Sequence, residues 1–142
     1  VVQILNERGW LGADVVGRTG NSTLFLVIQH AGLSTQEKYL PMMRDAVAKG
    51  NARGSDLALL EDRVLMRNGK RQLYGSQIGR FPDTGEYYLS PLEDPDHVDE
   101  RRAAMGLQPI AAYLMNWDMK WDVEQYKKEL PKLEQRLKAR KP

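Results

Sequence analysis

The sequence predicts a mainly helical α+β fold, a single domain that contains a small antiparallel β-hairpin. Apolar residues recur with helical spacing through most of the chain, most clearly over residues 55–67. Residues 71–78 and 86–90 have strand composition, and Pro82-Asp83-Thr84-Gly85 between them is typical of a turn. A length of 142 residues fits one domain.

The composition excludes several classes of protein. With 42% hydrophobic and 28% charged residues, the chain is typical of a globular domain. A net charge of +2 predicts neither a nucleic-acid nor a membrane partner, and no run of 18 apolar residues is present. The absence of cysteine excludes disulfides and thiol catalysis. A cytoplasmic location is favoured over export. Because the sequence begins with Val1 rather than methionine, we expect that a leader or preceding segment was removed.

The first part of the chain predicts three helices. A short one ends at Gly9, and a second spans residues 23–31 with Gly32 at its C-terminus. Five apolar residues in succession, 24–28, leave that second helix without a solvent face, so it should be central and should carry His30 inward. Ser34 and Glu37 match a capping box at the start of the third helix, and Pro41 predicts a kink or break within it.

The next helix begins at Ser55 and ends at Asn68-Gly69. Asn-Gly is also typical of a hairpin turn, which would pair residues 63–67 with 71–77. The helix is favoured because capping signals and apolar spacing agree. After the two strands, Pro95 begins a short helix and Pro109 another, over residues 110–117.

Residues 1–116 are expected to form the helical α+β core and residues 117–142 a charged, amphipathic C-terminal helical extension. This extension has one apolar stripe, broken near Pro131, which we expect to pack on the domain or on a second copy as a homodimer. Interspersed acidic residues favour an amphipathic helix over a nucleic-acid surface, although tryptophans and lysines alternate there.

A candidate site lies in the helix that begins at Ser55. Glu61 and Asp62 fall among its apolar residues, where a carboxylate must be paired, hydrogen-bonded or protonated. A structural ion pair or a cap on another helix would satisfy this requirement equally well. Together with His30, either carboxylate could form the pair that general acid–base catalysis needs. The planar guanidinium of Arg63 suits a substrate carboxylate.

Polar residues elsewhere are candidates for substrate binding. Tyr74, Ser76 and Gln77 follow one another in the first predicted strand, and Gln29 precedes His30. The same groups would also serve a pocket without chemistry or a purely structural cluster. His97 is expected on the surface. No HExxH or other paired ligand spacing is present, so neither a metal nor a cofactor is expected.

Several ordered motifs resemble a bacterial domain family of unknown function. The motifs are Gly9-Trp10, QHA at 29–31, LEDR at 60–63, QxYGSQ at 72–77 and VDERR at 98–102 followed by Met105-Gly-Leu107. The resemblance covers roughly residues 4–114 and implies that His30, Asp62, Arg63, Tyr74 and Gln77 belong to one constellation. This chain has Ser76 where the family is expected to have threonine, and Leu11 where proline is expected. The family brings no established activity.

Two functions are therefore expected from the residues. The first is a small cofactor-independent enzyme, a hydrolase or a lyase or cyclase, that uses a His–carboxylate pair on a small polar or peptide-like metabolite. The second is a non-catalytic ligand- or protein-binding module, such as an immunity or accessory protein, whose polar cluster is structural. A closed cluster with every polar group satisfied would favour the second function.

Overall fold

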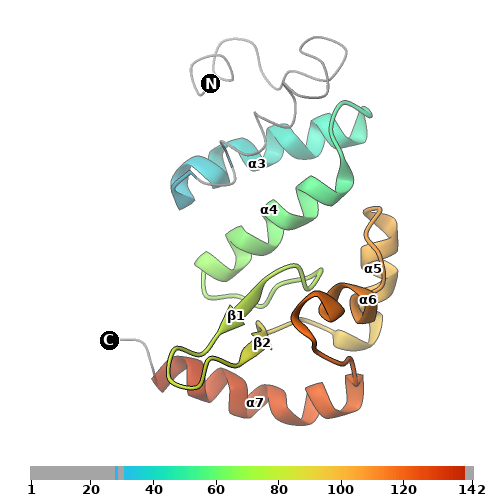
Figure 1. The fold of residues 1–142 in the computed structure, drawn as a ribbon. Helices are drawn as coiled ribbons and strands as arrows, with labels where there is room; N and C mark the ends of the chain where they lie inside the picture. Colours follow the sequence, from blue (N-terminus) through green and yellow to red (C-terminus); the bar gives the residue numbers. More distant parts are fainter. Residues whose placement is uncertain (1–27, 29–30, 140–142) are drawn as a thin grey trace.

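The computed structural model describes Ile28 and residues 31–139. The elements of this part, in chain order, are α3 (Leu33–Ala48), α4 (Gly54–Arg67), β1 (Ile78–Arg80), β2 (Tyr87–Leu89), the 3-10 helix η1 (Pro95–His97), α5 (Val98–Ala104), α6 (Ile110–Leu114), the 3-10 helix η2 (Met115–Trp117) and α7 (Val123–Ala139) (Figure 1). The predicted α+β fold, mainly helical with one antiparallel hairpin, is confirmed. The short helix expected before Gly9 lies outside the described residues, as does the expected 23–31 helix apart from Ile28 and Ala31.

Helices α3 and α4 lie side by side and enclose one hydrophobic core (Figure 1). Tyr39 and Met43 of α3 are buried against Leu57 and Leu60 of α4, and Ile28 packs into the same core. Burial of these side chains removes enough apolar surface to hold two helices together.

The start of α3 differs from the prediction. The helix begins at Leu33 after Gly32 and has no side-chain cap, so Ser34 lies inside the first turn rather than capping it. Of the kink or break predicted at Pro41, the break is absent because the helix is continuous there, and a kink stays a prediction. A proline removes a single backbone N–H donor. The buried contacts of Tyr39 and Met43 on either side of it hold the helix in place.

The helix expected from Ser55 is confirmed as α4. Its C-terminal residues Asn68 and Gly69 donate backbone hydrogen bonds to carbonyls of the last turn, and Gly69 has φ of +73°. A left-handed glycine after the last turn is the ordinary end of a helix. The alternative hairpin centred on Asn68-Gly69 is therefore wrong.

The predicted hairpin forms, but its first strand is shorter than expected. Ile78 is opposite Leu89 and Arg80 is opposite Tyr87 in antiparallel register, and the backbone N–H of Phe81 donates to Glu86 across the turn. Residues 71–77 were expected in the same strand. They instead form only an isolated parallel bridge, between Gln72 and Leu92.

The short helices after the hairpin begin at the predicted prolines. Pro95 is the first residue of η1, which leads into α5, and Pro109 precedes α6. The expected helix over 110–117 is α-helical only to Leu114 and continues to Trp117 as η2.

Helix α7 crosses the hairpin and contributes to a second core (Figure 1). Leu130 is buried, and the hydroxyl of Tyr126 donates to the carbonyls of Leu89 and Ser90 at 3.2 and 3.0 Å. The apolar stripe thus packs on its own chain. Helix α7 itself is continuous through Pro131. A homodimer through α7 stays a prediction. Among the described residues, no helix is long and apolar enough to span a membrane.

Candidate functional site

The site predicted from the sequence centres on a loop, residues 73–76, that α4 holds by one carboxylate. Asp62 is fully buried. Its Oδ1 accepts hydrogen bonds from the backbone N–H groups of Leu73 and Tyr74, at 2.8 and 3.0 Å. Its Oδ2 accepts from the N–H and the hydroxyl of Ser76, at 3.0 and 2.6 Å. Four donors on one carboxylate satisfy its acceptor sites and compensate for its burial.

The carbonyl groups of the same loop are bound from the opposite side. Arg101 Nε donates to the carbonyl of Leu73 at 2.7 Å, and Arg102 Nη1 donates to that of Tyr74 at 2.6 Å. The hydroxyl of Tyr113 donates to the carbonyl of Ser76 at 2.7 Å. Side chains from α4, α5 and α6 therefore take the place of a neighbouring strand. This explains why the expected strand does not begin before Ile78: the loop's polar backbone groups are already bound.

Arg102 is the largest fully buried side chain among the described residues. It is only 1% exposed, its Nε donates to the carbonyl of Gln108 at 2.6 Å, and its guanidinium lies 4.7 Å from the ring centre of Tyr113. Burial lowers the pKa of Arg102, while Tyr113, Asp99 and Asp62 raise it. Arginine stays protonated despite this shift, so the guanidinium is a fixed positive charge behind the loop.

Gln72 completes the support at the end of the loop. Its amide oxygen accepts from the backbone N–H of Gln77, and its amide nitrogen donates to the carbonyls of Gln77 and Ser90. Gly75 has φ of +69°, and a Cβ there would lie 2.8 Å from Ile110 Cδ1. The left-handed backbone conformation favours glycine at this position, and any larger residue would also displace the end of the Ile110 side chain. The loop is consequently rigid, and its shape depends on residues far apart in sequence.

The side chains of Glu61 and Tyr74 lie beside the loop of residues 73–76 and are partly exposed. Glu61 pairs with Arg44 of α3 at 3.1 Å, and the hydroxyl of Tyr74 lies 3.5 Å from the other oxygen of Glu61. Burial raises the pKa of the Tyr74 phenol, and the nearby charges of Glu61 and Asp62 raise it further. The hydroxyl of Tyr74 therefore stays protonated at neutral pH and is a hydrogen-bond donor.

Beside this loop, a shallow cavity of about 290 Å³ is bordered by Arg63, Met66, Arg67 and Gln77. Burial lowers the pKa of Arg63, and the like charge of Arg67 lowers it further. The Nη1 of Arg67 donates to the carbonyl of Ala31 and to the side-chain oxygen of Gln36, at 2.9 and 3.0 Å. Two guanidinium groups one helical turn apart make this cavity electropositive.

The sequence-predicted residues take different places around the loop. Arg63 and Gln77 border the same cavity. The hydroxyl of Ser76 donates inward to Asp62 and accepts from Gln77 Nε2 at 3.1 Å. His30 and Gln29 lie outside the described residues, so the expected hydrogen bond between His30 and Asp62 stays a prediction. His97, expected on the surface, is exposed and pairs with Asp94 at 2.9 Å.

Sequence reasoning missed the residues that bind the loop from behind, Gln72, Arg101, Arg102 and Tyr113. The available signal was the VDERR motif, in which two arginines follow two acids. Arg101, Arg102 and Tyr113 contact residues 28 to 37 positions away, and Gln72 contacts Ser90, 18 positions away. No local pattern reveals such contacts. Among the described residues, no group of three His, Cys, Asp or Glu side chains is placed to hold a metal ion.

Comparison with known proteins gives a family but no activity. A family model described as "Family of unknown function (DUF6624)" matches residues 1–124. No curated protein and no solved structure matches the sequence. The matched residues include the whole loop and every side chain that holds it.

Proposed function

We propose a function for this chain, which belongs to the family of unknown function DUF6624. The domain binds a small polar or peptide-like molecule, and it does so through a carboxylate group of that molecule. The cavity bordered by Arg63, Arg67 and Gln77 is the proposed site. The observation that carries this proposal is the placement of two guanidinium groups and one amide around a single cavity. A guanidinium binds a carboxylate through two parallel hydrogen bonds.

The geometry of the loop supports a binding site with a fixed shape. The backbone N–H of Gln77 donates to the side-chain oxygen of Gln72, and its side-chain Nε2 donates to the hydroxyl of Ser76. A ligand would therefore meet a side chain whose position is already set, which lowers the entropic cost of binding. Asp62 is a positioning residue in this proposal, because its oxygens are occupied by the loop.

Acid–base catalysis at the same cavity is the second candidate function, and one observation favours it. Arg67, which borders the cavity, donates to the carbonyl of Ala31, the residue that follows His30 in the sequence. An imidazole beside an arginine-bound carboxylate could transfer a proton near neutral pH. In this candidate the enzyme would be a cofactor-independent hydrolase, lyase or cyclase.

A titration series tests the carboxylate site that both candidates share. Acetate, succinate and N-acetylglycine are titrated while amide and guanidinium NMR signals are recorded. We expect N-acetylglycine or succinate to shift the Arg63 signals, and Arg63→Gln to weaken binding about tenfold or more. Lys70→Gln is the matched control, since it removes one exposed charge just after α4 without lining the cavity. Equal affinities in both variants would refute the site.

The His30→Ala variant separates binding from turnover. Protein is incubated with a mixture of polar metabolites and short peptides, and the products are followed by mass spectrometry. For an enzyme, we expect His30→Ala to lose turnover by about 100-fold or more and to keep its affinity. A pure binding module would consume nothing in either form.

A further inference from the structure

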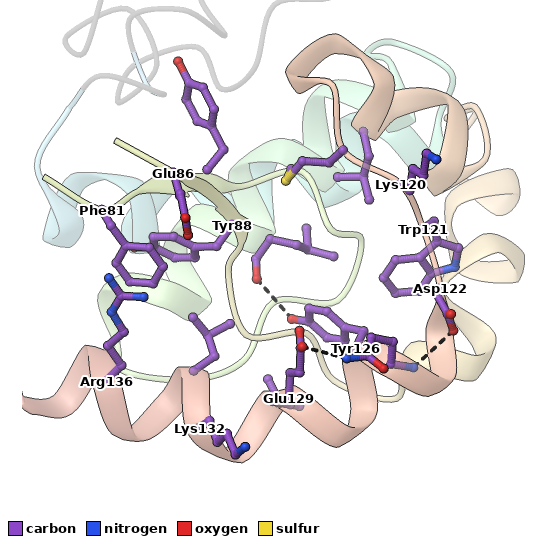
Figure 2. A pocket seen from close by; sticks show the side chains of 17 residues that line it. Phe81, Glu86, Tyr88, Lys120, Trp121, Asp122, Tyr126, Glu129, Lys132 and Arg136 are labelled. Carbon is purple, nitrogen blue, oxygen red and sulfur yellow. Dashed lines mark hydrogen bonds between the residues drawn. The ribbon is translucent and has the colours of Figure 1, made fainter. Parts of the chain in front are cut away.

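A second and larger cavity, which shares no lining residue with the Arg63 cavity, lies between the hairpin and α7 (Figure 2). Its volume is about 450 Å³, within the range of small-molecule sites. Leu89, Leu114 and Leu130, all buried, contribute apolar surface to it. Most of α7 follows residue 124, the last residue matched by the family model, so one wall of this cavity is formed outside the matched region.

Two aromatic pairs line this cavity. Phe81 and Tyr88 have ring centres 4.3 Å apart, and those of Trp121 and Tyr126 are 5.4 Å apart. Figure 2 shows the Phe81–Tyr88 pair at one end and Trp121 at the other. Aromatic walls favour a ligand with a ring of its own, through offset stacking and edge-to-face contacts.

The aromatic walls are fixed before any ligand arrives. The hydroxyl of Tyr126 is bound to two carbonyls of the hairpin, and Phe81 is buried beneath the guanidinium of Arg136, 3.5 Å from its ring centre. Tyr88 lies across Gly79, where a Cβ would come within 2.2 Å of the tyrosine ring. A preformed apolar cavity loses little conformational entropy on binding.

The charged groups around the opening indicate which ring-bearing ligand fits. Among the acids, Asp122 accepts from the backbone N–H of Gln125, and Glu129 accepts from the Gln125 side chain at 2.7 Å. Lys120 and Lys132 are exposed and make no hydrogen bond or ion pair with the described residues. Glu86 lies at the Phe81–Tyr88 end (Figure 2). Lys120 and Lys132 thus have ammonium groups without a partner among the described residues, while Asp122 and Glu129 each already accept a hydrogen bond from Gln125.

We propose that this cavity binds a small aromatic carboxylate, with its ring against the aromatic walls and its carboxylate at Lys120 or Lys132. The site is separate from the Arg63 cavity and does not depend on the function proposed there. Both parts of the ligand are required: the ring for the apolar interior, and the charge for the lysines at the opening.

Indole-3-acetate is the probe that tests the proposal, with indole and acetate as its two halves. Binding is followed by NMR through the indole N–H signal of Trp121. We expect indole-3-acetate to bind at least tenfold more tightly than either half. If it does not bind at millimolar concentration, or if indole binds equally well, the proposal is overturned.

Matched variants assign the contacts. The double variant Lys120→Gln/Lys132→Gln should weaken binding about threefold to tenfold, the range expected for two exposed charges. Lys128→Gln/Lys138→Gln removes the same charge from α7 without touching the cavity and should leave binding unchanged. Equal weakening in both double variants would show a general charge effect and overturn the proposal.

Two further variants complete the test. Tyr88→Leu keeps an apolar side chain but removes the ring, and should weaken binding about tenfold. Should this variant fail to fold, the exposed lysines still decide the outcome. Arg63→Gln should bind indole-3-acetate normally. Loss of binding in Arg63→Gln alone would place the probe in the other cavity and overturn the assignment made here.

Discussion

At the scale of single residues, Asp62 shows how one buried carboxylate can organise a stretch of backbone. The sequence predicts that Asp62 lies beside His30 and forms an acid–base pair with it. The structure shows that its two oxygens accept four hydrogen bonds from Leu73, Tyr74 and Ser76. A carboxylate that accepts this many hydrogen bonds, most of them from backbone N–H groups, resembles the carboxylate that caps the N-terminus of a helix.

The first prediction concerns this carboxylate. Asp62→Asn replaces one acceptor oxygen by an NH₂ group that faces other donors. We expect it to lower the free energy of unfolding by about 2–4 kcal/mol, measured by urea denaturation. The control is Asp45→Asn, whose exposed pair with Lys49 should contribute less than about 1 kcal/mol. A change at Asp62 no larger than at Asp45 would contradict the role given to the four hydrogen bonds.

At the scale of elements, α7 is attached to the hairpin by both apolar and polar contacts. Leu130 supplies the buried apolar contact, Arg71 binds Glu134 at 2.7 Å, and Arg136 lies 3.3 Å from Asp83. Leu130 belongs to the apolar stripe, whereas Glu134 and Arg136, two positions apart, lie on either side of that stripe. The periodicity of the sequence predicted that stripe, but not the surface that it covers.

The second prediction measures this attachment. Leu130→Ala leaves a cavity beneath α7 and should lower the free energy of unfolding by about 2–4 kcal/mol. Gln135→Ala changes an exposed residue of the same helix and should have an effect below about 0.5 kcal/mol. Thermal and urea denaturation of both variants provide the comparison. Equal stability of the two would mean that α7 is only loosely attached.

At the scale of the whole molecule, the third prediction is that stability falls in alkali because several tyrosines are buried. Burial raises the pKa of Tyr126, Tyr113 and Tyr74. In the unfolded chain these phenols lose their protons near pH 10. The folded protein keeps them longer, so the unfolded state is favoured as pH rises from about 10 towards the folded pKa values. Each tyrosine contributes up to about 1.4 kcal/mol per pH unit.

Urea unfolding at pH 8, 10 and 11 checks this expectation. Tyr126→Phe should be less stable than the parent chain at pH 8, by about 1 kcal/mol, because its hydrogen bonds to the hairpin are lost. Its stability should then fall less steeply above pH 10. Tyr87→Phe, at a tyrosine that is 45% exposed, should keep the slope of the parent chain. If stability fell with pH at the same rate in all three proteins, Tyr126 would ionise as readily in the folded chain as in the unfolded chain, and the prediction would be wrong.

How much of this molecule the sequence predicts depends on the range of the contacts involved. Helix α4 and the turn at 82–85 follow from neighbouring residues, and both are present. The strand expected at residues 71–77 is not, because Asp62, Arg101 and Arg102 bind its backbone from elsewhere in the chain. Likewise, the sequence predicts the residues of one candidate site. The cavity between α7 and the hairpin is not predicted, because it depends on which helix covers the hairpin.

The loop of residues 73–76 also has a consequence for how the molecule is assembled. Ser76 in this loop is hydrogen-bonded to Asp62, 14 positions earlier in the chain, and to Tyr113, 37 positions later. During synthesis, the segment leaves the ribosome before α5 and α6 exist, so Asp62 alone is available to restrain it. The Arg63 cavity should therefore take its final form late in folding, because such distant contacts carry a large cost of chain closure. Amide exchange during refolding would show Tyr74 and Ser76 gaining protection after the interior of α4.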